Sequence, residues 1–327
     1  MKTFIIKSIF YILLILIALE LMVYAFHLYT EDPPRFIDEF GVEKRVPGET
    51  GHAVFGNRNQ SYSEFVINNS GFNSHRDFLP TLSKFEVAII GDSFIEGFHQ
   101  NYNNSIGKKI EEQIPGIEVY EYGIGGYDLA NQLHLINTYK EDFLLIDEII
   151  IYLNFESDLK RASYTPNYDR MDMLKSPLFR LRDNIKILSY GSKIGIIEPL
   201  KRLATGKAFI KDKKGYKTNE LEVISAKEKR LRDITYLENF ESLTMLYGFD
   251  KIKTTLLLNS RKTSTLFLDY CRANNIKYID FSENFEKSKK PTTLIYDWHW
   301  NDHGRSLIAE QIAKYLKEKY DSELFGK

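Results

Sequence analysis

The feature that most restricts the fold is an alternation of short apolar runs with helical patterns. Residues 85–90 and 148–153 are apolar runs of strand length, the second of which reads EIIIYL, and residues 117–122 predict another strand between them. A run without polar alternation predicts a strand that is buried on both faces, as in parallel sheets. Residues 105–113 and 127–143 have helical spacing between these runs. The sequence therefore predicts an α/β fold, a three-layer α/β/α sandwich with a mainly parallel sheet.

The alternation is interrupted in the second half of the chain and then returns. Residues 160–250 are rich in Lys, Arg, Tyr and Leu, with helical spacing at 178–188 and 226–247. We interpret this stretch as a helical insertion that serves as a lid or a partner-binding element. Residues 276–281 predict a further strand, and residues 304–320 predict an amphipathic helix.

Residues 8–29 form an apolar run with one acidic residue, Glu20. At 1.5 Å per residue, a helix of this length is about 30 Å long, which matches the hydrocarbon core of a bilayer. Because Lys2 and Lys7 precede the run, the positive-inside rule predicts a single-pass anchor with the remaining chain on the extracytoplasmic side. A signal peptide cleaved after residues 23–25 is the alternative.

These patterns divide the chain into three parts. Residues 1–30 are the membrane anchor or signal segment, residues 31–84 are a juxtamembrane segment that packs on the domain, and residues 85–327 are the domain with its insertion. The chain has 44 Lys and Arg residues against 45 Asp and Glu residues, a balance that argues against a nucleic-acid partner. A single cysteine, Cys271, excludes an internal disulfide.

Four polar fragments are expected at one edge of the sheet. In open parallel sheets, ligands bind beyond the carboxyl ends of the strands. Three turns follow predicted strands and a fourth fragment precedes the last predicted helix; they cover residues 91–93, 123–127, 154–158 and 297–301. A nucleophile, oxyanion donors and a base would meet at such an edge.

Ser93 is the candidate nucleophile of the first fragment. Its hydroxyl needs a neighbouring base, and a helix N-terminus would place backbone N–H groups beside it. The alternative is that Ser93 or Asp92 only caps the helix. In the second fragment, Gly125 and Gly126 let the backbone approach a substrate, although a plain turn explains them equally well.

Asp297 and His299 are the candidates of the last fragment. A carboxylate two residues before a histidine can orient its Nδ1–H group and leave Nε2 as a base. A surface histidine beside a helix cap at Asn301 or Asp302 is one alternative. A metal site is another, because His299 and His303 have H-x₃-H spacing.

Together, the fragments resemble the SGNH (GDSL-type) hydrolase family. Gly91-Asp92-Ser93 matches the first family block, and Gly126 within YGIGGYD matches the second. DWHWNDHG at 297–304 resembles the D-x-H-W-N-x-x-G variant of the last block. Upstream, INNSGFNSHRDF at 67–78 is similar to an N-S-x-G-F-R segment that precedes the first block in membrane-anchored members.

The resemblance implies a flavodoxin-like SGNH fold and a role for each matching residue. Ser93 would be the nucleophile, His299 the base and Asp297 its orienting carboxylate. The oxyanion donors would be the Ser93 N–H, the Gly126 N–H and an asparagine side chain. No metal or organic cofactor is implied.

The third family block departs from the pattern. It reads LNFESDL at 153–159, so Asp158 matches, but Ser157 stands where the family has asparagine. Asn154, three residues earlier, is the candidate substitute. Loss of one oxyanion donor lowers a rate by about 10²–10³-fold, so this departure bears directly on activity.

The predicted function is an exported, membrane-tethered serine esterase or O-acyltransferase. Its substrate would be an acylated carbohydrate or lipid of the cell envelope, and residues 8–29 would bind the membrane. The alternative is a non-catalytic binding or assembly protein of the same fold in envelope polysaccharide modification. Ser157 and the insertion motivate this alternative, which would require an envelope-assembly partner.

Overall fold

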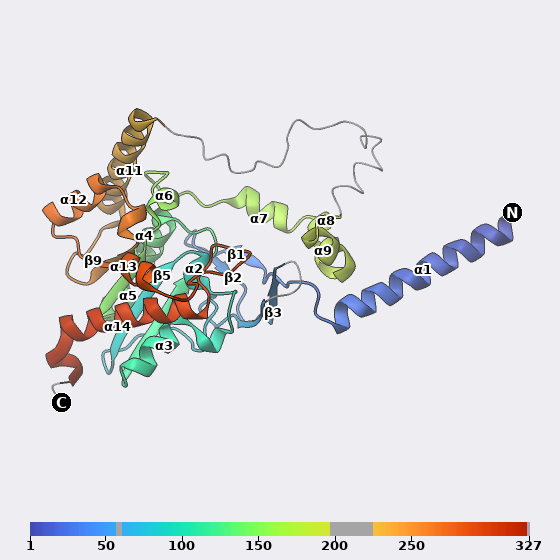
Figure 1. Ribbon diagram of the computed structural model, residues 1–327, viewed down its shortest axis with the longest axis horizontal. Coiled ribbons are helices and arrows are strands. Elements are labelled where there is room, and N and C mark those ends of the chain that lie inside the picture. Colours follow the sequence, from blue (N-terminus) through green and yellow to red (C-terminus); the bar gives the residue numbers. More distant parts are fainter. Residues whose placement is uncertain (57–60, 197–224, 326–327) are drawn as a thin grey trace. The chain divides into compact units, whose positions relative to one another are not determined.

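A computed structural model describes residues 1–56, 61–196 and 225–325 (Figure 1). The chain forms two compact units. The first, which we call the anchor unit, contains Met1–Asp32, His52–Tyr62 and Asn167–Val223; the second, the sheet unit, contains Pro33–Gly51, Ser63–Pro166 and Ile224–Lys327.

The sheet unit is built on five strands, and each strand is parallel to its neighbours. Numbered along the chain, their order is 2-1-3-4-5, which is the flavodoxin-like order. From one edge to the other, the strands are β6 (Ile117–Gly123), β5 (Phe85–Gly91), β7 (Glu148–Tyr152), β8 (Thr254–Leu258) and β9 (Tyr278–Asp280). The predicted parallel α/β sheet is thus confirmed.

Helices cover both faces of this sheet (Figure 1). The side chains of β5 alternate, so Ala88 and Ile90 pack into one apolar core while Val87 and Ile89 pack into the other. The first core is closed by α4 (Leu129–Thr138), α5 (Lys140–Leu145), α11 (Ala226–Tyr247) and α12 (Thr265–Ala273), and the second by α3 (Ile106–Gln113) and α14 (Asp302–Phe325). This is the predicted three-layer sandwich.

Three details differ from the sequence-based prediction. The helix predicted over 127–143 is interrupted at Tyr139, which separates α4 from α5. Strand β8 was not predicted, although its sequence TTLLL is fully buried. Helix α11 spans 226–247 as predicted, but Phe240 and Leu243 pack in the core, so this end of the predicted insertion belongs to the sandwich. Residues 197–224 of that insertion lie outside the described residues.

The segment before β5 contributes to the interior of the sheet unit. Strands β1 (Arg35–Ile37) and β2 (Glu43–Arg45) pair antiparallel, and Arg45 is 2% exposed. Phe72 joins the same core as α4, so the segment does more than pack on a surface. β3 (Thr50–Phe55) and β4 (Ser61–Val66) form a second pair.

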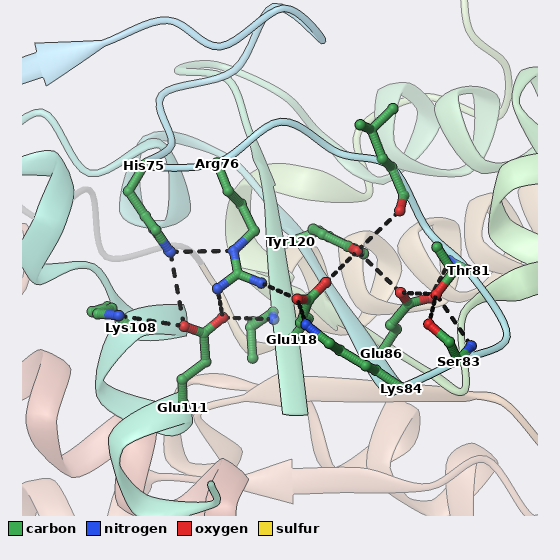
Figure 2. A network of polar contacts seen from close by, with 12 residues as sticks. His75, Arg76, Thr81, Ser83, Lys84, Glu86, Lys108, Glu111, Glu118 and Tyr120 are labelled. Atoms are coloured by element: carbon green, nitrogen blue, oxygen red, sulfur yellow. Dashed lines mark hydrogen bonds and ion pairs between the residues drawn. The ribbon is translucent and has the colours of Figure 1, made fainter. Parts of the chain in front are cut away.

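Figure 2 shows how residues 75–86 attach to the sandwich. Arg76 forms ion pairs with Glu111 of α3 at 2.8 Å and with Glu118 of β6 at 3.3 Å. The Tyr120 hydroxyl donates towards Glu118 at 3.0 Å. These charged contacts fix the segment to the edge of the sheet formed by β6.

The anchor unit begins with α1 (Lys2–Ala25), which has a mean hydropathy of 2.4 over its most apolar window. Of the helices in the described residues, it alone is long and apolar enough to cross a membrane. Glu20 of α1 accepts hydrogen bonds from the backbone N–H groups of Lys186 and Ile187, at 2.7 and 2.8 Å. The unit also contains α7 (Tyr168–Leu174), α8 (Pro177–Asn184) and α9 (Lys186–Lys193).

Candidate active site

The turn after β5 presents Ser93 as the first residue of a short helix, α2 (Ser93–Glu96). Asp92 is the cap of this helix, because its carboxylate accepts the Phe94 N–H at 2.8 Å. Burial raises the pKa of Asp92 to about 6. Capping is therefore assigned to Asp92, and the Ser93 hydroxyl is available for a different contact.

That contact is with His299, on the loop that precedes α14. Ser93 Oγ lies 2.7 Å from His299 Nε2, and His299 Nδ1 lies 2.6 Å from Asp297 Oδ1. The His299 backbone N–H also donates to Asp297 Oδ1, at 3.1 Å. Serine, imidazole and carboxylate thus form one hydrogen-bonded series between residues that are 206 positions apart.

The electrostatics of Asp297 favour its charged form. Partial burial opposes the charge, but the hydrogen bonds from His299 and its electrostatic attraction outweigh this effect and lower the pKa of Asp297. A carboxylate that stays ionised holds the Nδ1–H tautomer of His299 and directs Nε2 towards Ser93.

A second histidine, His99, completes this cluster. His99 Nε2 lies 3.3 Å from Asp297 Oδ2, and its ring stacks on that of His299. Burial and the neighbouring His299 lower the pKa of His99 to about 3, so this ring is neutral. The sequence patterns did not single out His99, although it follows Ser93 by only six residues and lies just beyond α2.

The glycine turn after β6 lies beside Ser93, since Gly91 and Gly123 are register partners at the ends of β5 and β6. A Cβ atom at position 125 would lie 2.8 Å from Glu96 Oε2 and 3.6 Å from Ser93 Cβ, so a larger residue there would displace the Glu96 carboxylate. Gly126 has a φ of 90°, in the region that favours glycine. Within the described residues, neither the Ser93 nor the Gly126 N–H has a hydrogen-bond acceptor.

The turn after β7 continues into α6 (Phe155–Asp158) and contains both candidates for a third donor. Ser157 Oγ donates to Asp158 Oδ1 at 2.6 Å, so this hydroxyl is already engaged. Asn154 Oδ1 accepts the Glu156 N–H at 3.3 Å, while its Nδ2 donates to no group among the described residues. Burial and the nearby Asp92 raise the pKa of Asp158 well above its ordinary value.

A cavity of about 260 Å³ opens beside Phe94, the residue that follows Ser93. Asn154 lines it, as does Trp298, which lies between Asp297 and His299 in the chain. Its walls are largely aromatic, with Phe94, Tyr152, Phe155, Phe281, Phe285, Trp298 and Trp300. The cavity can therefore receive an apolar group beside Phe94 and Asn154.

The metal alternative involves a different set of residues from the one predicted. His99, Asp297 and His299 have ligand atoms within 4.8 Å of one another, whereas the His303 ring bonds to Ser288 Oγ at 2.9 Å. The His99 and His299 rings lie 20° from parallel, so their in-plane lone pairs do not converge on one ion. These residues do not fit a metal site in this arrangement.

A serine, a histidine and an aspartate in series, at the carboxyl edge of a sheet of this order, are the arrangement used by serine esterases. The family model described as GDSL-like Lipase/Acylhydrolase matches residues 87–312, and the chain belongs to this family. Its class is therefore that of the ester hydrolases. No curated protein matches the chain.

Solved structures with a similar arrangement come from several bacteria. A lipolytic protein of the G-D-S-L family from Veillonella parvula is 14% identical, with 70% of this chain and 97% of that chain covered and a TM-score of 0.37. A lipase/acylhydrolase from Enterococcus faecalis is 11% identical, with 72% and 96% covered and a TM-score of 0.41. A carbohydrate acetylesterase family member from Sinorhizobium meliloti is 11% identical, with 72% and 98% covered and a TM-score of 0.36.

Proposed function

We propose that this chain is a membrane-anchored serine esterase or O-acyltransferase that forms an acyl-enzyme on Ser93. The observation that carries the proposal is the hydrogen-bonded series from Ser93 Oγ through His299 to Asp297, at 2.7 and 2.6 Å. Membership of a family of lipases and acylhydrolases supports the same chemistry.

In the first half-reaction, Ser93 Oγ attacks the carbonyl carbon of an ester while His299 Nε2 takes the hydroxyl proton. The negative charge moves to the carbonyl oxygen, where the N–H groups of Ser93 and Gly126 stabilise it. The intermediate then collapses. The ester C–O bond breaks, and the leaving alcohol takes the proton from His299.

The second half-reaction reverses these roles. His299 removes a proton from water or from a sugar hydroxyl, and the resulting oxygen attacks the acyl-enzyme carbonyl. When the bond to Ser93 Oγ breaks, the serine recovers its proton from His299. Water gives a free acid, whereas a sugar hydroxyl gives a new ester.

We assign the third oxyanion contact to Asn154 rather than to Ser157. The Asn154 Nδ2 group is uncommitted among the described residues and its side chain lines the cavity, whereas the Ser157 hydroxyl is bonded to Asp158. Asn154 would thereby take the place of the asparagine that the family has three residues later.

The size of the cavity supports a short acyl group. Its volume of about 260 Å³ is below the range of about 300–1,000 Å³ that holds a drug-sized ligand. We propose an acylated envelope glycan or lipid as the substrate, because an α1 anchor would hold the sheet unit at a membrane surface, on the extracytoplasmic side.

The test uses the full chain in a detergent without ester bonds. Turnover of p-nitrophenyl acetate, butyrate and octanoate would be compared for the wild type, Ser93→Ala and His299→Ala. Mass spectrometry after exposure to a fluorophosphonate would locate the modified residue. We expect labelling of Ser93, faster turnover of the shorter esters, and loss of both in the two variants.

Each other outcome changes the assignment. Turnover that persists in Ser93→Ala would overturn the acyl-Ser93 mechanism. An intact wild type that neither turns over esters nor reacts with the fluorophosphonate would favour the non-catalytic binding protein. Inactivation by a chelator, restored by a divalent metal, would favour metal-dependent hydrolysis instead.

A further inference from the structure

Two arginines of the β1–β2 hairpin reach the glycine turn that lies beside Ser93. Arg35 Nη1 donates to the backbone oxygen of Gly125 at 2.8 Å and to Glu43 Oε1 at 2.8 Å. The Arg35 and Glu43 side chains are each only 8% exposed. A paired, buried guanidinium thus holds the carbonyl of the peptide group that joins Gly125 to Gly126.

The second arginine, Arg45, contacts the turn indirectly, through a glutamate that binds the N–H of Gly125. Arg45 Nε pairs with Glu96 Oε1 at 2.8 Å, and Glu96 Oε2 accepts the Gly125 N–H at 2.8 Å. Both charged side chains are at most 4% exposed. The Tyr127 hydroxyl also donates to the backbone oxygen of Glu43, which ties the end of the turn to the hairpin.

Because the peptide group is planar, these contacts also determine where the Gly126 N–H points. In a planar trans peptide, the C=O of one residue and the N–H of the next point in opposite directions. Because Arg35 holds the Gly125 oxygen, the Gly126 N–H points away from the Arg35 guanidinium. This N–H is one of the two backbone oxyanion donors of the proposed reaction.

We infer that Arg35 is a positioning residue that aims the Gly126 N–H at the oxyanion, and that the hairpin thereby completes the active site. The inference rests on the proposed function. It assigns a catalytic purpose to a segment that lies outside the residues of the family match, 87–312. The segment also follows the anchor unit directly in the chain, since the sheet unit begins at Pro33.

Such a role predicts a specific kinetic signature. An N–H that stabilises the oxyanion acts in the transition state and much less in the ground state, so misdirecting it lowers kcat and leaves KM nearly unchanged. Complete loss of an oxyanion donor lowers kcat by about 10²–10³-fold, and we expect a misdirected donor to lower it by about 10–100-fold.

The test compares two ways of removing the Arg35 contact with a matched control. In Arg35→Ala, the Gly125 oxygen loses the Arg35 donor and Glu43 loses its ion pair with Arg35. In the double variant Arg35→Met with Glu43→Met, both charges of this ion pair are removed together, and the unfolding midpoint reports whether the fold is kept. Arg76→Ala is the control, because Arg76 also links the N-terminal segment to two glutamates but lies in the network of Figure 2.

Measurements are kcat and KM for p-nitrophenyl acetate, the rate of fluorophosphonate labelling and the unfolding midpoint. We expect both Arg35 variants to lose kcat at nearly constant KM, and Arg76→Ala to keep kcat even if its unfolding midpoint falls. Free guanidinium, far below denaturing concentration, should restore part of the kcat of Arg35→Ala and should not raise that of Arg76→Ala.

Unchanged kcat in the folded double variant, with wild-type turnover that depends on Ser93, would overturn the inference and leave the proposed function standing. A rise in KM alone would also overturn it, because it would assign Arg35 to substrate binding. Absence of Ser93-dependent turnover in the wild type would instead remove the proposed function itself.

Discussion

The ring of His99 lies flat against the ring of His299, with their centroids 4.0 Å apart and their planes 20° from parallel. His99 also lies against the Asp297 oxygen that does not face His299, at 3.3 Å. The two contacts restrain the histidine and the aspartate of the proposed triad from one side.

Replacing His99 by phenylalanine should keep the stacked ring and remove the contact with Asp297. A displacement of about 1 Å near the reacting groups can lower a rate by about 100-fold, so we expect a loss of kcat of about 10–100-fold. Since burial lowers the pKa of His99 to about 3, its ring does not titrate above about pH 4. The dependence of kcat on pH in His99→Phe should therefore keep the wild-type shape at lower kcat values. Loss of the acidic or the basic limb of this curve would contradict a neutral His99.

Asp297→Asn should lower kcat by about 10³–10⁴-fold, because an amide in place of the carboxylate no longer selects the Nδ1–H tautomer of His299. Fluorophosphonate labelling of Ser93 should slow in parallel, whereas tryptophan fluorescence should show an intact fold. Both tryptophans, Trp298 and Trp300, flank His299 in the chain and report on this loop. A variant with near wild-type labelling would remove Asp297 from the triad.

Asn154→Ala and Ser157→Ala separate the two candidates for the third donor. If Asn154 Nδ2 binds the oxyanion, Asn154→Ala should lower kcat by about 10²-fold at nearly constant KM. Ser157→Ala removes the hydroxyl contacts with Asp158 and with the Asn154 backbone oxygen, so the unfolding free energy should fall by about 1 kcal/mol with little effect on kcat. The reverse pattern would assign the donor to Ser157.

Glu121 predicts a pH dependence of stability. Its side chain is fully buried, and desolvation raises its pKa to about 7. Hydrogen bonds with Ser105 and Gly107 and the charge of Arg305 act in the opposite direction but do not outweigh the desolvation. Between its ordinary pKa of 4.5 and about 7, the folded state holds a proton that the unfolded state releases. The free energy of unfolding therefore falls as the pH rises through this window.

Glu121→Gln has no carboxyl group that titrates at this position. Its free energy of unfolding, relative to that of the wild type, should therefore rise from pH 5 to pH 8. We expect a change on the order of 2 kcal/mol, measured by denaturant unfolding followed through tryptophan fluorescence. An equal difference in unfolding free energy between Glu121→Gln and the wild type at pH 5 and at pH 8 would show that Glu121 keeps its charge in the folded state.

The anchor prediction is checked by fractionation. If α1 spans the bilayer, the full chain should resist alkaline extraction from membranes, and a chain without residues 2–25 should be released. Intact mass measurement of the membrane-bound protein distinguishes an uncleaved anchor from a signal peptide removed near residue 25.

The sheet and the triad geometry could be predicted from the sequence because both depend on local patterns. Apolar runs such as residues 148–153 are typical of buried strands, and the turns that follow such strands meet at one edge whatever the details of packing. Ser93 could therefore be placed at this edge, and the motif DWHWNDHG at 297–304 joined Asp297 and His299 to it through the family resemblance.

The contribution of the hairpin could not be predicted in the same way. The sequences around Arg35 and Arg45 have no apolar pattern that marks a buried strand. A buried arginine is recognised only through its partners. Those partners, Glu96 and the Gly125 backbone, lie far along the chain, so no local spacing joins them. His99 is intermediate, since its closeness to Ser93 in sequence was visible but its stacking on His299 was not.

The separation of 206 positions between Ser93 and His299 also imposes an order on biogenesis. A ribosome or a translocation channel delivers the nucleophile long before its base, which lies in the loop directly before α14. A chain interrupted before this loop would have the serine without the means to activate it. The proposed esterase activity would then begin only after the loop with His299 has been made and has folded against Ser93.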